Sequence, residues 1–282
     1  MAERGAGMAT PPLGTLWLGD TLPKLELMCL LSMVARRWDI TVFSYGPIDN
    51  LPGEIPLRDA RDIHPANLSD PALGEAAIHP AMFSDIFRLH MMEKEGLVWV
   101  DSDFLVVKED FPPVTPILVG MLPGDVINNA ALWIEPGHPV FEDYKAAVDE
   151  DPPQPKPYFR DVRNQAIRDR AGTDNPVDRN VFSPKHLTGP TPLTYFLNQH
   201  SCMDQVLPHT VFYPLSYNRR KELWRSNTHV LKQFADDTVA VHMWGSHIRN
   251  WMEVTTPDPG TFLAEQIKLL DKDLMRVREG AA

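Results

Sequence analysis

The stretch 96–104 constrains this chain more than any other part, because a glycine and a short apolar run lead directly into two aspartates. An apolar run bounded by a glycine predicts a buried strand. In open α/β sheets, ligands bind beyond the carboxyl ends of the strands, so Asp101 and Asp103 are expected at a binding site. Carboxylate oxygens are hard ligands that suit Mg²⁺ or Mn²⁺, and a cation held there would bridge to phosphate oxygens.

An acidic turn is the alternative for the same residues. Phe104–Val107 would then begin a second strand, and the two aspartates would only mark the turn before it. The Asp-Ser-Asp triplet on its own favours this turn. The segments around the triplet favour the binding site instead.

The segments before this strand predict an α/β fold. Leu13–Leu18 is typical of a strand, Leu22–Arg37 of a helix with apolar residues close to helical spacing, and Ile40–Tyr45 of a second strand. The order strand, helix, strand with short loops is a βαβ unit and predicts a parallel sheet. The loops lack the G-x-G-x-x-G pattern, so a dinucleotide-binding site is not expected.

The remaining elements are predicted from apolar periodicity and from the positions of Gly and Pro. Residues 50–80 are expected to be mostly loop, and 149–186, rich in proline and charge, to be a connector or surface element. The expected helices are Phe83–Glu95 (closed by Gly96), His138–Val148, Thr191–Asn198 and Thr261–Val277, and the expected strands are Ile127–Ile134, Val211–Tyr213 and Thr238–Val241.

Composition excludes several classes of protein. A net charge of −11 over 282 residues leaves no basic surface for nucleic acid. Cys29 and Cys202 lie far apart without C-x-x-C spacing, which argues against a zinc site or disulfide scaffold and fits a reducing compartment. No apolar run is long enough to span a membrane, and the N-terminus lacks the apolar core of a signal peptide. The expected location is the cytoplasm, either free or in contact with a membrane surface.

Two further groups of polar residues are candidates for a site. Asp85 and Arg88 are three residues apart and share one face of the predicted helix, with Ser84 beside them; an N-cap serine with a surface ion pair is an equal alternative. Asn128 and Asn129 lie in an otherwise apolar strand, where unpaired amides are costly. One of the two amides is expected to point into a site or to satisfy a buried backbone group.

His242 follows the apolar run of the last predicted strand. His247 comes five residues later, a spacing that does not place both imidazoles on one helical face, so a two-histidine zinc site is not expected. A lone histidine at a strand end is usually structural. Two aspartates, however, leave most of an octahedral Mn²⁺ shell open, and imidazole is acceptable there. We therefore predict that His242 completes the metal site or bonds a diphosphate.

Together these segments resemble one family. They are similar to the sugar-binding region, with its DXD motif, of the family 32 glycosyltransferases. The segments that carry this likeness are Ser84-Asp85-x-x-Arg88 and then Gly96-x-x-Trp99-x-Asp101-Ser102-Asp103. The family includes initiating α-1,6-mannosyltransferases and globotriaosylceramide-type α-1,4-galactosyltransferases. Further similar segments follow in order: Leu16–Gly19 in the first strand, Asn128–Ala130 with Glu135–Pro139, Thr188–Pro190, and His242 with Trp244–Ser246. The chain departs from the family pattern in having Gly96 alone before the DXD strand, and 150–186 resembles nothing recognisable.

The resemblance implies a GT-A-type fold, a Rossmann-like mixed α/β sheet flanked by helices. After a flexible tail (1–12), a single catalytic domain (13–282) would bind the nucleotide-sugar mainly through 13–110 and the acceptor through 111–282. It implies Mn²⁺ or Mg²⁺, a UDP- or GDP-sugar donor, a glycan or glycolipid acceptor in polysaccharide biosynthesis, and retention at the anomeric carbon. The implied metal ligands are Asp101, Asp103 and His242; the implied donor-binding residues are Trp17, Ser84, Asp85, Arg88, Asp101, Ser102, Asp103, Asn128 and Gly245; and the implied catalytic residues are Asp85, Arg88 and Asn129.

The chemistry of the residues is compatible with this activity. A metal on two carboxylates would act as a Lewis acid toward the diphosphate leaving group, and Arg88 would add a fixed positive charge. No pair of carboxylates can be identified as acid and nucleophile, so glycoside hydrolysis is disfavoured. Two alternatives stay open: a non-catalytic nucleotide- or glycan-binding protein on the same fold, and a metal-dependent phosphohydrolase that uses Asp101 and Asp103.

Overall fold

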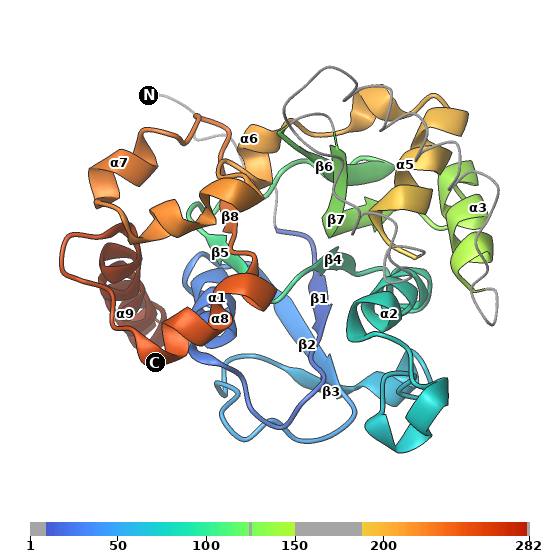
Figure 1. The fold of residues 1–282 in the computed structure, drawn as a ribbon, viewed down its shortest axis with the longest axis horizontal. Helices are drawn as coiled ribbons and strands as arrows, with labels where there is room; N and C mark the ends of the chain where they lie inside the picture. Colours follow the sequence, from blue (N-terminus) through green and yellow to red (C-terminus); the bar gives the residue numbers. More distant parts are fainter. Residues whose placement is uncertain (1–9, 124–125, 150–187, 281–282) are drawn as a thin grey trace.

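The computed structural model describes residues 10–123, 126–149 and 188–280. A six-stranded sheet lies at the centre in the order β3-β2-β1-β4-β7-β6, and a separate two-stranded sheet pairs β5 with β8 (Figure 1). The strands are β1 (Leu13–Leu16), β2 (Ile40–Ser44), β3 (Leu57–Asp59), β4 (Val98–Val100), β5 (Phe104–Val106), β6 (Ile117–Leu122), β7 (Val126–Ile134) and β8 (Ala240–His242). The expected α/β architecture with a mixed sheet is confirmed.

The N-terminal half of the sheet is parallel, as the βαβ pattern predicts. β1 pairs in parallel with β2 on one side and with β4 on the other, and β2 pairs in parallel with β3. β4 ends at Val100, so Asp101 follows the carboxyl end of a central strand. The acidic turn is also present, because the chain turns at Ser102 and Asp103 before β5 begins. The predicted strand end and the predicted turn therefore coexist.

The other half of the sheet is antiparallel. β7 pairs with β4 and β6 in antiparallel register. β6 and the short edge strand β3 are not predicted from the sequence. In β6 the apolar run is interrupted by Gly120, where the pairing with β7 shifts its register. β3 has only three residues and no buried one, so it carries no apolar pattern.

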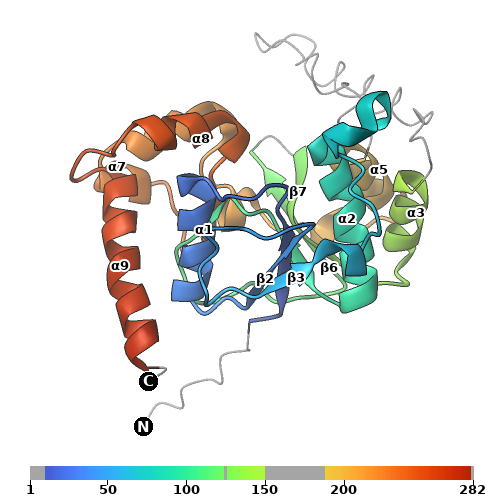
Figure 2. The same cartoon turned by 90° about the horizontal axis from the view of Figure 1, so that it is seen from below.

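Helices cover both faces of the main sheet (Figure 2). α2 contacts β1 and β4, α5 contacts β7, and α3 packs against both helices. α1 lies on the other face with α8 and α9 against it and also packs on β5. The helices are α1 (Lys24–Ala35), α2 (Pro80–Glu95), α3 (Pro139–Val148), α5 (Pro190–Gln199), α6 (His209–Phe212), α7 (Asn227–Leu231), α8 (Gly245–Val254) and α9 (Phe262–Gly280), with 3₁₀ turns at Ala60–Asp62, Pro71–Ala76, Met203–Gln205 and Tyr217–Trp224.

α2 carries the Ser-Asp-x-x-Arg segment and begins three residues earlier than predicted. The imidazole of His79 accepts the N–H of Ala81 and so caps the helix. Pro80 occupies the first helical position, where a missing N–H costs nothing. Gly96 ends the helix in the left-handed conformation, with φ of 65°. Ser84 is therefore an interior residue of the helix and not its N-cap.

The strand predicted at Val211–Tyr213 is wrong, because Val211 and Phe212 belong to the helical turn α6 after Pro208 and Tyr213 follows that turn. Three consecutive buried apolar residues carry no period that distinguishes a strand from a helix. α8 is also not predicted from the sequence. The predicted connector at 149–186 and the predicted flexible tail at 1–12 fall almost entirely outside the described residues.

No helix among the described residues is long and apolar enough to cross a bilayer. The predicted donor and acceptor parts, 13–110 and 111–282, contribute strands to the same sheet, because β7 of the second part pairs with β4 of the first. That division therefore stays a functional prediction.

Candidate functional site

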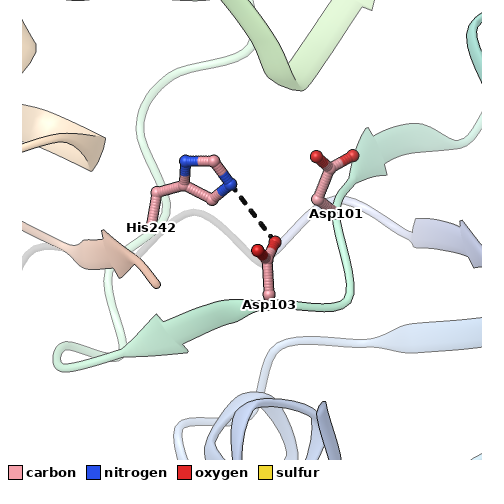
Figure 3. Close-up of side chains that lie close together, drawn as sticks. All are labelled: Asp101, Asp103 and His242. Atoms are coloured by element: carbon pink, nitrogen blue, oxygen red, sulfur yellow. Dashed lines mark ion pairs between the residues drawn. The ribbon is translucent and has the colours of Figure 1, made fainter. Parts of the chain in front are cut away.

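Asp101, Asp103 and His242 converge at the carboxyl end of β4 (Figure 3). One ligand atom from each of the three side chains lies within 4.8 Å of the other two. Nε2 of His242 is 3.3 Å from Oδ1 of Asp103. The convergence arises because β8 pairs with β5 in a register that places His242 opposite Phe104, next to Asp103.

The imidazole of His242 is held by aromatic rings. Phe104 stacks on it with ring centres 5.2 Å apart, Tyr213 meets it edge-on, and Trp244 lies 4.3 Å away between ring centres. The residue is buried, and its Nδ1 has no hydrogen-bond partner among the described residues. The ring is thus fixed in one orientation with Nε2 toward the aspartates. A purely structural histidine could instead bond a buried backbone group, and none of the contacts of His242 among the described residues is such a bond.

Asp103 uses its two carboxylate oxygens differently. Oδ2 accepts the backbone N–H of Gly245 at 2.6 Å, while Oδ1 faces His242. Burial by itself would raise the pKa of Asp103, but the charge of His242, its hydrogen bond and the Gly245 N–H outweigh burial and hold that pKa below its usual value. The same carboxylate raises the pKa of His242 against the effect of burial. Without a metal, the two residues therefore favour an ion pair.

Asp101 lies in a different environment. Its Oδ1 accepts the indole N–H of Trp99 at 2.7 Å and is 3.6 Å from the guanidinium of Arg88. Burial raises the pKa of Asp101 to about 6, against the charge of Arg88 and with a contribution from the neighbouring Asp103. Two carboxylates this close to each other repel, and a divalent cation would relieve that repulsion.

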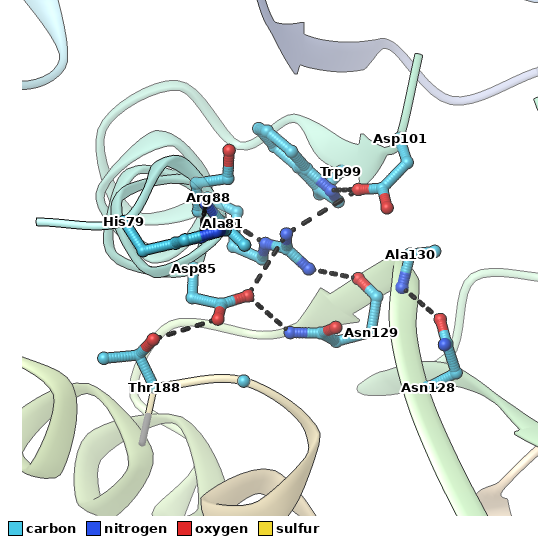
Figure 4. Close-up of polar contacts among 12 residues, drawn as sticks. His79, Ala81, Asp85, Arg88, Trp99, Asp101, Asn128, Asn129, Ala130 and Thr188 are labelled. Carbon is cyan, nitrogen blue, oxygen red and sulfur yellow. Dashed lines mark hydrogen bonds and ion pairs between the residues drawn. The ribbon is translucent and has the colours of Figure 1, made fainter. Parts of the chain in front are cut away.

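A buried polar network joins α2 to β7 beside Asp101 (Figure 4). Oδ1 of Asp85 accepts the side-chain amide of Asn129 at 2.8 Å and lies 3.2 Å from Arg88. Its Oδ2 accepts the hydroxyl of Thr188 at 2.9 Å. Burial raises the pKa of Asp85, and Arg88, Asn129 and Thr188 work against that increase.

Arg88 is buried at 4% exposure, so the predicted surface ion pair is excluded. Its Nε donates to the carbonyl of Ser84, its Nη1 to the carbonyl of Asn129, and its Nη2 faces Asp85 and Asp101. The guanidinium also lies 4.6 Å from the ring centre of Trp99. Arg88 therefore connects α2 with Asp101.

The two asparagines of β7 behave differently. Asn129 is buried and belongs to the network around Asp85. The side-chain oxygen of Asn128 accepts the backbone N–H of Ala130 and the hydroxyl of Tyr213. Asn128 thus faces the aromatic group that surrounds His242.

The other predicted donor-binding residues lie around the same turn. Ser102 is half-buried between the two aspartates, and Gly245 begins α8 against Asp103. Ser84 contributes its backbone carbonyl to Arg88. Trp17 follows β1, and its indole N–H donates to the carbonyl of Thr21. The parallel pairing of β1 with β4 places Trp17 on the same edge of the sheet as Asp101.

Thr188 and Trp99 also belong to the site, through their bonds to Asp85 and Asp101, and neither was predicted from the sequence. The sequence motifs could have identified both residues, since each lies in a short segment that resembles the family 32 glycosyltransferases. A Cβ at Gly189, the residue after Thr188, would lie 2.8 Å from Oδ2 of Asp85. The Gly-Pro element therefore lets the chain approach Asp85 closely enough for Thr188 to bond it.

The three converging side chains fit a divalent cation. Two carboxylates and an imidazole form a ligand set that suits Mn²⁺. The stacked ring of His242 directs Nε2 toward the aspartates, which is the position that a ligand nitrogen would take. Asp101, Asp103 and His242 are also the only group of this kind among the described residues.

Comparison with known families gives one match. A family described as the alpha 1,4-glycosyltransferase conserved region matches residues 192–265. This segment includes His242 and Gly245 but not the two aspartates. The match supports a glycosyltransferase, and no curated protein matches the chain.

Two solved structures show a loose likeness. A structure described as PaToxG glycosyltransferase has 16% sequence identity and a TM-score of 0.43, covering 68% of this chain and 70% of that one. The apo-form glycosyltransferase GlyE of Streptococcus pneumoniae TIGR4 has 9% identity and a TM-score of 0.34, covering 93% and 64%.

Proposed function

We propose that this protein is a metal-dependent glycosyltransferase that moves a sugar from a UDP- or GDP-sugar to a glycan or glycolipid hydroxyl, with retention at the anomeric carbon. The observation that carries the proposal is the convergence of Asp101, Asp103 and His242. His242 belongs to the segment that matches the glycosyltransferase family, and the aspartates belong to the DXD-like turn. Two independent signals from distant parts of the chain therefore meet at one point.

Asp101, Asp103 and His242 would hold Mn²⁺ or Mg²⁺. When bound, the cation would neutralise negative charge that develops on the diphosphate leaving group. The ion pair between Asp103 and His242 implies that His242 gives up a proton before it can act as a ligand. The aromatic rings around His242 limit its movement, so the imidazole would keep its orientation when the proton leaves.

Asp85, Arg88 and Asn129 would serve the donor sugar. Most N–H groups of Arg88 already have acceptors in the protein, so we propose that Arg88 acts through its charge and by fixing Asp85 and Asp101. Asp85 would accept bonds from sugar hydroxyls, because each carboxylate oxygen can accept more than one. A preorganised network of this kind stabilises charge without rearrangement during the reaction.

The test is incubation with a panel of UDP- and GDP-sugars, with Mn²⁺ or with a chelator. A glycosyltransferase should release nucleoside diphosphate and free or transferred sugar in equal amounts, only with metal. Asp103→Asn should abolish the release. Binding without turnover would instead indicate a non-catalytic binding protein, and release of inorganic phosphate would indicate a phosphohydrolase. A thermal-shift screen of the same panel identifies the donor, because a ligand that binds the folded state raises Tm.

A further inference from the structure

Helix α8 begins at the metal site, and its first residue lies between two carboxylates. A Cβ at Gly245 would be 3.0 Å from Oε1 of Glu26 and 3.1 Å from Oδ2 of Asp103. The backbone N–H of Gly245 donates to that same oxygen of Asp103. Trp244, just before, has φ of 57°, which is unfavourable for a bulky residue such as tryptophan. Other contacts must therefore hold the start of α8 in this conformation.

Glu26 supplies the second carboxylate from the first turn of α1. Its side chain is fully buried, and its Oε1 accepts both Nε and Nη2 of Arg249 at 2.8 and 2.6 Å. Its Oε2 is buried and has no partner among the described residues. A buried carboxylate is costly unless it is paired. Arg249 is the cation paired with Glu26, and it works against the burial that raises the pKa of this carboxyl.

Arg249 lies one turn along α8 from Gly245 and contacts two other elements. It binds Glu26 of α1, and its guanidinium carbon is 5.6 Å from the ring centre of Trp17, just beyond β1. One side chain thus ties the start of α8 to α1 and to the edge of the sheet where the donor is proposed to bind. The Gly245 amide has little freedom to move away from Asp103 while these contacts persist.

We infer that Glu26 and Arg249 form a positioning pair for the metal site. By fixing the start of α8, the pair keeps the Gly245 amide on Oδ2 of Asp103 and so directs Oδ1 toward His242 and the cation. This role rests on the proposed metal-dependent function. Partners that orient a ligating carboxylate without touching the metal commonly change metal affinity when they are altered.

A second link between the same helices provides a matched control. The backbone N–H of Lys24 donates to Oε1 of Glu253 at 2.7 Å, and its ammonium donates to the carbonyl of Glu253 at 2.9 Å. This contact joins α1 to the far end of α8, away from Gly245. It therefore contributes to helix packing without bearing on Asp103.

The test compares two double variants, Glu26→Gln with Arg249→Gln and Lys24→Ala with Glu253→Ala, by calorimetric titration with Mn²⁺ alone; Glu253→Ala removes the acceptor of the Lys24 N–H, which a glutamine would keep. Each double variant leaves the net charge unchanged, which separates positioning from a simple change in electrostatic potential. The first should weaken Mn²⁺ binding by about tenfold and the second by less than about twofold. Circular dichroism and Tm confirm that each variant is folded. If the first fails to fold, Arg249→Lys keeps the charge but loses the fork of donors, and it should weaken binding in the same direction.

Three results would overturn the inference. Unchanged Mn²⁺ affinity in a folded Glu26–Arg249 variant would show that the pair only stabilises the fold. Equal weakening in the Lys24–Glu253 variant would show that any loosening of α8 has the same effect. If the unmodified protein does not bind Mn²⁺, the proposed metal site itself is wrong, and the positioning role falls with it.

Discussion

Nε2 of His242 lies 3.3 Å from Oδ1 of Asp103, although the two residues belong to segments far apart in the chain. Two features of the backbone create this contact. His242 pairs with Phe104 across β5 and β8, and the N–H of Met243 donates to the carbonyl of Asp103 at 3.0 Å. The pairing of β5 with β8 therefore brings the two side chains together.

Asp101→Ala and Asp103→Ala should each reduce turnover by roughly a thousandfold, which corresponds to about 4 kcal/mol of barrier. Asp103→Ala should also lower the free energy of unfolding by about 1–3 kcal/mol, because the N–H of Gly245 loses its acceptor. Steady-state kinetics with Mn²⁺ and urea unfolding measure the two effects. Turnover within about threefold of the unmodified enzyme in both variants would rule out the metal role.

Arg88→Lys should be strongly impaired in activity. A point charge cannot replace a planar guanidinium that bonds two carbonyls and faces two carboxylates at once. The matched control is Arg58→Lys, because Arg58 makes a two-pronged contact with Glu95 far from the proposed ligands. Comparable kcat/KM values for the two variants would show that the geometry around Arg88 is not needed for catalysis.

His242→Ala should raise the Mn²⁺ concentration for half-maximal activity by about tenfold or more, because the metal loses a ligand. His247→Ala is the control, since His247 of α8 contacts Tyr217 and is not among the converging ligands. An unchanged midpoint with a near-normal maximal rate in His242→Ala would exclude both metal ligation and contact with the diphosphate.

In the metal-free protein, the contribution of the Asp103–His242 pair to the free energy of unfolding should depend on pH. Folding lowers the pKa of Asp103. The stability that Asp103 contributes is therefore present above pH 3.8 and is lost as the pH falls through the pKa of the folded state. Folding raises the pKa of His242. The stability that His242 contributes is therefore present below pH 6.5 and is lost as the pH rises through the pKa of the folded state. Urea unfolding with a chelator should therefore show a larger stability loss for His242→Ala at pH 5 than at pH 9. A loss that is the same at both values would contradict the ion pair.

Thr188→Val should disturb Asp85 without changing the volume of the side chain much. It removes a buried hydrogen bond to a charged group, which contributes about 1.5–3 kcal/mol. We expect lower kcat with little change in Mn²⁺ affinity, because Thr188 contacts Asp85 and not the metal ligands. Thr210→Val, which removes an exposed bond to Asp237, is the control and should leave kcat unchanged.

The sequence was sufficient wherever local chemistry decides the structure. The apolar run before Asp101 forms the predicted buried strand, because Gly96 supplies the left-handed residue that ends the preceding helix and bounds the run. The βαβ order determines a parallel sheet, since a short crossover allows no other pairing. The metal role predicted for Asp101 and Asp103 also followed from local sequence and stays a prediction.

Other features depended on contacts that the sequence does not display. Asp85 and Arg88 have the same spacing in a surface ion pair as in a buried network, and burial by β7 and Thr188 distinguishes the two. Val211–Tyr213 is apolar in either secondary structure, and packing made it a helical turn. In both cases the residues that decide the structure lie far away in the chain. The local sequence therefore carries no periodic pattern that would reveal the outcome.

The sequence by itself thus determined the strand that delivers the two aspartates, the helix that precedes it and the residue types suited to a cation. Only the tertiary structure decided that His242 meets Asp103, that Arg88 joins Asp85 to Asp101, and that Gly245 stands between Asp103 and Glu26. The physical reason is that backbone propensity and apolar periodicity act over a few residues. The pairing of β5 with β8 and the packing of α8 on α1 are settled by the burial of the whole core.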